Sequence, residues 1–140
     1  MKIEEAYPPN YEKIKERFDL TGKAPLFCYG DTIYNPHKAI IRPDLEVHEA
    51  VHCLQQGDKI EEWWDRYLDD SDFRLSQELE AYVAQYTFIK SKVKAKLADK
   101  YLDLFAEILS SPIYGNLLTT AQAKTKIKKL YISSNKQNVV

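Results

Sequence analysis

Five consecutive residues, His48 to His52, carry the side chains in this chain that are best suited to chemistry. They read His-Glu-Ala-Val-His. Positions four apart on a helix lie one above the other, so both imidazoles can reach a single ion. Glu49 lies one position along, close enough to reach a water molecule on that ion. This H-E-x-x-H spacing predicts Zn²⁺ bound by His48 and His52, with Glu49 as the catalytic general base.

A catalytic zinc site needs a third protein ligand, and three residues are candidates. His37 is the remaining histidine, but it lies in an Asn-Pro-His-Lys loop that favours an exposed side chain. Glu78 and Glu80 lie on a predicted long helix. At 100° per residue, Glu78 is about 70° from the centre of the apolar arc and Glu80 about 130°. We expect Glu78 to be the ligand, because at the core edge a cation would offset the cost of burying its carboxylate.

The motif is predicted to lie on a helix over 44–56. Pro43 and Asp44 suit the start of a helix, because proline is tolerated in the first turn and an acid there interacts favourably with the helix dipole. Gly57 suits its end.

Strands are predicted only before the motif. Two runs rich in aromatic and β-branched residues, 26–29 and 32–34, flank Gly30-Asp31 and predict a hairpin. Residues 38–41 are predicted to add a third short strand, whose edge could take an extended peptide.

Helical patterns fill the rest of the chain. Helices are predicted at 10–19, 60–70, 73–96, 98–110 and 116–130, with a loose tail from about 133. The expected fold class is α+β, with a small two- or three-stranded sheet and a mostly helical body. A length of 140 residues predicts one domain over 1–140.

Composition indicates an ordinary globular protein, with 44% hydrophobic and 29% charged residues. No apolar run approaches the length of a membrane span, and the charged start of the chain lacks the apolar core of a signal peptide. Two cysteines are too few to suggest a disulfide framework. Cys53 points about 100° away from His52 on a helix, so we interpret it as a core thiol. These features predict a cytoplasmic protein.

Charge is unevenly distributed along the chain. Residues 44–80, which contain the motif, hold twelve acids and three bases, whereas residues 81–140 hold three acids and ten bases. The acidic segment suits a site for a divalent cation. The basic half could meet a nucleic acid or an acidic partner, although a solvated helix face is the favoured interpretation. Its densest cluster comprises Lys124, Lys126, Lys128 and Lys129.

These motifs resemble those of gluzincin-type zinc metallopeptidases, in which a glutamate on a second helix is the third zinc ligand. In compact families of this type the second helix reads Glu-x-x-Ala, as in Glu78 to Ala81. The next position is often Asp or Asn, which supports a ligand histidine, whereas here it is Tyr82. Short phage-encoded metallopeptidases are the most similar group, sharing Tyr34-Asn35-Pro36, Gln55-Gln56 and a Trp-Trp/Phe-Arg stretch. The resemblance covers about residues 26–90 and implies a minimal zincin-like domain.

What the resemblance implies is hydrolysis of a peptide or protein substrate. Glu49 would activate water, and a further side chain would stabilise the oxyanion. The sequence does not choose among the oxyanion candidates Arg74, Tyr82, Tyr86 and Tyr114.

Two other functions compete with this one. The chain could be a non-catalytic zinc-binding or protein-interaction module, acting through its basic carboxyl-terminal half. It could also be a di-iron protein, because Glu49 and His52 form a Glu-x-x-His pair. Di-iron bundles need a second such pair on another helix, and no glutamate precedes His37 or His48 by three residues.

Overall fold

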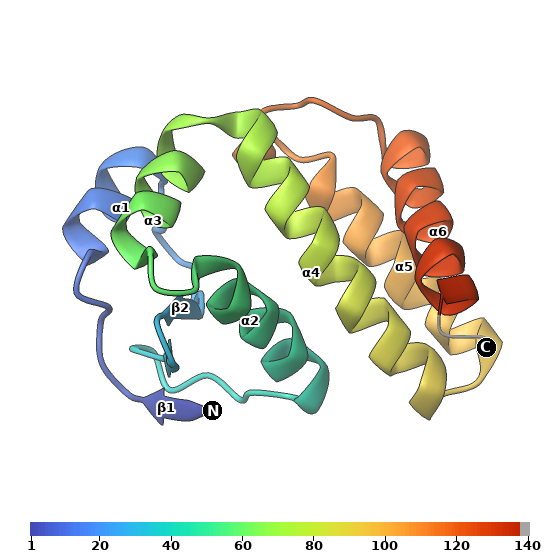
Figure 1. Ribbon diagram of the computed structural model, residues 1–140, viewed down its shortest axis with the longest axis horizontal. Helices are drawn as coiled ribbons and strands as arrows, with labels where there is room; N and C mark the ends of the chain where they lie inside the picture. Colours follow the sequence, from blue (N-terminus) through green and yellow to red (C-terminus); the bar gives the residue numbers. More distant parts are fainter. Residues whose placement is uncertain (138–140) are drawn as a thin grey trace. The chain divides into compact units, whose positions relative to one another are not determined.

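The computed structural model describes residues 1–137, with side chains to residue 135 (Figure 1). The chain divides into two compact units, one from Met1 to Asp70 and one beginning at Ser71. Helices predominate and the only sheet in the described part is small, so the α+β class is confirmed. Two compact units can belong to one domain, so the one-domain organisation stays a prediction.

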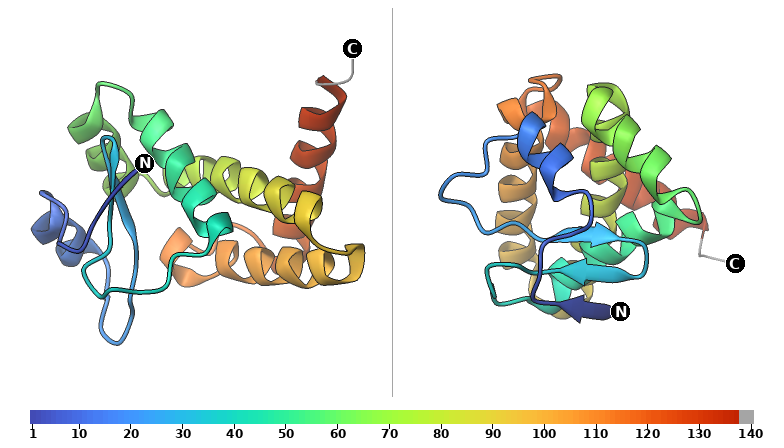
Figure 2. Two further views of the ribbon diagram at one scale, coloured as in Figure 1. Left: turned by 90° about the horizontal axis from the view of Figure 1, so that it is seen from below. Right: turned by 90° about the vertical axis from the view of Figure 1, so that its left-hand side faces the viewer.

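The first unit contains a mixed three-stranded sheet (Figure 2). Strand β2 (Phe27–Tyr29) and strand β3 (Thr32–Tyr34) form the predicted antiparallel hairpin. Gly30 has a φ of +67°, a conformation that glycine adopts without steric cost. Strand β1 (Lys2–Glu4) pairs parallel with β3 on its other side.

The predicted third strand at 38–41 was wrong, and β1 takes the third place in the sheet. The side chain of Asn35 explains why 38–41 does not pair. Its Nδ2 donates to the carbonyl of Ala39 and its Oδ1 accepts from the amide of Ala39, both at 2.9 Å. Because Asn35 occupies both backbone groups of Ala39, that residue cannot offer them to a neighbouring strand.

Three helices complete the first unit: α1 (Tyr11–Arg17), α2 (Pro43–Gln56) and α3 (Ile60–Asp69). The motif helix α2 begins at Pro43 and ends just before Gly57, as these two residues led us to expect. Helices α1 and α3 are joined by ion pairs one turn apart, Lys13 with Asp65 and Arg17 with Asp69. The buried apolar residues of this unit are Ile14, Phe27, Cys28, Ile33, Trp63, Trp64, Tyr67 and Leu68.

The second unit consists of helices α4 (Ser71–Lys92), α5 (Ala95–Leu109) and α6 (Thr120–Gln137), with a short 3₁₀ helix η1 (Pro112–Tyr114). The three long helices pack around one apolar core that includes Tyr82, Leu102, Phe105 and Ile127. No helix within residues 1–137 is long and apolar enough to cross a membrane.

Helix boundaries in the second unit differ from the prediction. Helix α4 ends at Lys92 and α5 begins at Ala95, whereas the predicted boundary lay at 96–98. Helix α6 begins four residues later than predicted, because Thr119 and Gln122 exchange hydrogen bonds between side chain and backbone amide, as in a capping box. It continues through Gln137, so the predicted loose tail is helical over 133–137, and residues 138–140 lie outside the described residues.

Candidate metal centre

The motif helix is attached to the β2–β3 hairpin at its carboxyl-terminal end. Gln56, 2% exposed, donates from Nε2 to the carbonyl of Cys28 and accepts at Oε1 from the amide of Gly30, both at 2.8 Å. The indole of Trp64 on α3 donates to the same Cys28 carbonyl at 3.1 Å. One buried glutamine thus fixes α2 against strand β2 and the first residue of the hairpin turn, which sets the direction in which the motif residues point.

A disulfide between Cys28 and Cys53 makes the same connection covalent, with Cα atoms 5.8 Å apart. The interpretation of Cys53 as a core thiol was therefore wrong. Cys53 does point away from His52, but the side of α2 that it faces is the one on which the hairpin packs. Disulfides are typical of oxidising compartments. The cytoplasmic location stays a prediction, and the disulfide does not favour it.

The two motif histidines lie together on the buried side of α2. His48 and His52 are 7% and 5% exposed, and their Nε2 atoms are 3.2 Å apart. Two nitrogen ligands of one tetrahedral zinc, each about 2.0–2.1 Å from the metal, would be separated by about 3.3 Å. The pair therefore has the separation that a shared ion requires.

His52 is held on several sides by its own unit. Its Nδ1 lies 2.8 Å from Oε1 of Gln55, one helical turn later. Its ring packs against Trp63 and Tyr67, with centroids 5.5 and 6.3 Å away, and these two rings stack on each other. Trp63 therefore forms a wall of the histidine site. Trp64 instead contacts the β2 backbone against which α2 is held.

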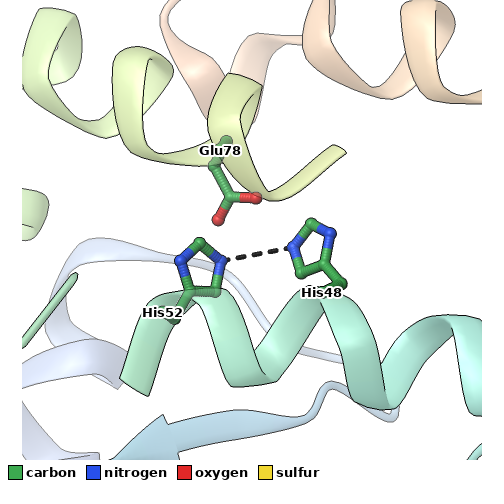
Figure 3. Close-up of side chains that lie close together, drawn as sticks. All are labelled: His48, His52 and Glu78. Carbon is green, nitrogen blue, oxygen red and sulfur yellow. Dashed lines mark hydrogen bonds between the residues drawn. The ribbon is translucent and has the colours of Figure 1, made fainter. Parts of the chain in front are cut away.

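Glu78 completes a group of three residues that could hold a metal ion. His48, His52 and Glu78 each offer one ligand atom, and these atoms lie within 4.8 Å of one another (Figure 3). Glu78 is 4% exposed. Glu80, the alternative ligand, is exposed. Two imidazoles and a carboxylate are a donor set that zinc commonly takes, so the residues fit the predicted ion.

The remaining predicted residues lie in varied surroundings. His37 is exposed and its ring meets the edge of Tyr7. Glu49 is half-buried. The four oxyanion candidates are all buried, and burial raises the pKa of the Tyr86 phenol. The choice among these four stays open.

Of the basic cluster, only Lys124 has an ion pair in the described part of the chain, with Asp103 of α5. The contact raises the pKa of the Lys124 ammonium, chiefly through the hydrogen bond to Asp103. Lys126, Lys128 and Lys129 are exposed along α6. A nucleic-acid partner for this face stays a prediction.

Sequence reasoning gave no role to Gln55 or Gln56, although both contact the elements of the site. The signal was present in the spacing, because Gln55 lies one turn after His52 and Gln56 one turn after Cys53. Residues at such spacings share a helix face, so each could be expected to act beside its partner.

Comparison with known proteins gives no match. No protein-family model matches the chain, and no curated protein or solved structure is significantly similar to it. The resemblance to gluzincin-type and phage-encoded metallopeptidases stays a prediction.

Proposed function

We propose that this protein is a zinc-dependent metallopeptidase. The observation that carries the proposal is the buried group of His48, His52 and Glu78, with Glu49 beside it on the motif helix. A helix that places two histidines 3.2 Å apart and a carboxylate next to one of them supplies both ligands and a general base.

The three buried residues would hold the ion. Zinc in such a site acts as a Lewis acid that lowers the pKa of water and polarises a carbonyl group. Burial strengthens the attraction between the Glu78 carboxylate and a cation, because little solvent screens it. An ion is also the partner that best offsets the cost of placing this carboxylate inside the protein.

Glu49 would move the proton. Its carboxylate accepts a proton from the water that attacks a peptide carbonyl and then delivers it to the departing amine. A half-buried side chain suits this task, because it can meet both water and substrate. We expect the substrate to be a peptide or protein, as the resemblance to metallopeptidases implies.

Metal content tests the ligand set. Purified wild-type protein should hold about one zinc per chain, the stoichiometry of a single three-ligand site. Glu78→Ala should lose the zinc, because the Glu78 carboxylate is the only negatively charged group among the three proposed ligands. Glu80→Ala is the matched control, an exposed glutamate two residues along the same helix, and should keep it. Equal zinc in all three proteins would contradict the ligand assignment, and iron bound in pairs would contradict a zinc site altogether.

Cleavage of a mixed peptide library tests the reaction. Glu49→Gln should keep zinc and lose about 10²–10⁴-fold in cleavage rate, the usual contribution of a general base. Glu46→Gln is the matched control, because Glu46 is a half-buried glutamate in the first turn of the same helix. This variant should cleave peptides at the wild-type rate. A wild-type protein that holds zinc and cleaves nothing would favour the non-catalytic module instead.

A further inference from the structure

Gln55 lies on the motif helix at a position from which its side chain meets the outer nitrogen of His52. The 2.8 Å contact joins its Oε1 to Nδ1 of the imidazole. Both residues lie on α2 within the first unit, three positions apart. The contact lies within one helix, because the spacing His-x-x-Gln places the two side chains on the same face of α2.

The chemistry of the two groups fixes where the hydrogen lies. An amide oxygen can only accept a hydrogen bond, so Nδ1 of His52 must donate. A neutral imidazole carries a single hydrogen, and placing it on Nδ1 leaves Nε2 with a lone pair. That lone pair is on the nitrogen that lies 3.2 Å from Nε2 of His48.

We propose that Gln55 is a positioning residue that holds His52 in the tautomer able to bind a metal ion through Nε2. The proposal rests on the proposed zinc site, and it adds a residue that is not itself a ligand. Gln55 selects the tautomer, while Trp63 and Tyr67 limit the tilt of the ring through their packing against it.

The size of the effect follows from the role. Hydrogen-bond partners of metal-bound histidines contribute about 10–100-fold to metal affinity, because they fix the ring and make the ligand nitrogen more basic. A neutral amide is a weaker acceptor than a carboxylate. Gln55→Glu should therefore keep or increase the affinity, whereas Gln55→Leu should weaken it.

The test measures Zn²⁺ affinity by competition with a chromophoric chelator, together with the His52 tautomer by ¹⁵N NMR of the metal-free protein. We expect Gln55→Leu to bind Zn²⁺ about 10–100-fold more weakly. Its His52 should no longer be held as the Nδ1–H tautomer, and Gln55→Glu should restore both properties. Leu54→Ala, an exposed neighbour on α2, controls for general damage to the helix.

The outcomes separate this inference from the proposed function. If wild-type protein binds no Zn²⁺, the proposed function fails and with it any role for Gln55 in metal binding. If wild-type protein binds Zn²⁺ and Gln55→Leu binds it equally well with an unchanged tautomer, the positioning role is overturned while the zinc site stands. A loss of affinity that Gln55→Glu does not restore would also overturn it, since a merely structural role predicts that result.

Discussion

Two adjacent glutamines in this chain contact different parts of the site. Gln55 meets a candidate metal ligand, and Gln56 meets the backbone of strand β2 and of the hairpin turn that follows it. Side chains of successive helical residues point about 100° apart, so neighbours in sequence serve different surroundings. Gln55 and Gln56 therefore have separate functions, and neither side chain can replace the contacts of the other.

Gln56→Leu is expected to destabilise the protein by about 1–3 kcal/mol. The change leaves the buried amide of Gly30 without its acceptor, and an unsatisfied buried donor costs about 1–3 kcal/mol. Urea unfolding followed by tryptophan fluorescence measures the loss. Leu54→Ala, at a side chain that is 82% exposed, should change stability by no more than about 0.5 kcal/mol. Equal stability of wild type and Gln56→Leu would show that Gln56 does not hold the hairpin.

Single residues of the site differed in how far sequence could predict them. His48, Glu49 and His52 were identifiable because their chemistry depends on spacing within one turn of helix. Glu78 could be preferred over Glu80 because a helical projection separates the core edge from solvent. Cys28 and Cys53 could not be paired, because their contact depends on how the hairpin packs on α2, and local spacing does not encode that packing.

At the scale of elements, the proline and glycine residues that begin or end helices and form turns carried most of the predictable information. Pro43 and Gly57 bound the motif helix as expected, and Gly30 forms the hairpin turn. Strand β1 was missed because three exposed residues show no pattern of burial, and their pairing is made by backbone atoms alone. The error at 38–41 has the opposite cause, since a strand-like composition was overridden by the side chain of Asn35.

The disulfide between β2 and α2 is expected to stabilise the first unit substantially. It joins residues 25 positions apart. Closing a loop of that length in the unfolded chain corresponds to about 3.5 kcal/mol at 25 °C in the chain-entropy description. A Cys28→Ser/Cys53→Ser double variant should show that loss in urea unfolding. Adding a thiol reductant should destabilise wild type but leave the double variant unchanged; wild type that is insensitive to reductant would contradict the expectation.

At the scale of the whole molecule, a metal ion that binds only the folded chain should raise its stability. A ligand at 100 times its dissociation constant adds about 2.7 kcal/mol to the free energy of unfolding. Zinc-loaded wild type should therefore unfold at a higher temperature than protein treated with a chelator. Glu78→Ala should show no such difference, and Glu80→Ala should show the wild-type difference. A shift of equal size in Glu78→Ala would place the stabilising ion elsewhere.

The disulfide also gives the molecule a covalent ring that runs from Cys28 to Cys53 and contains both motif histidines. Within that ring lies Ile40, whose side chain is 89% exposed in a segment without regular structure. Exposed segments of this kind are preferred sites of proteolysis. A chain cut once there would remain a single molecule and migrate as intact protein until a thiol reagent separated the pieces. A cut at this position would therefore separate the pieces on a reducing gel and not on a non-reducing one.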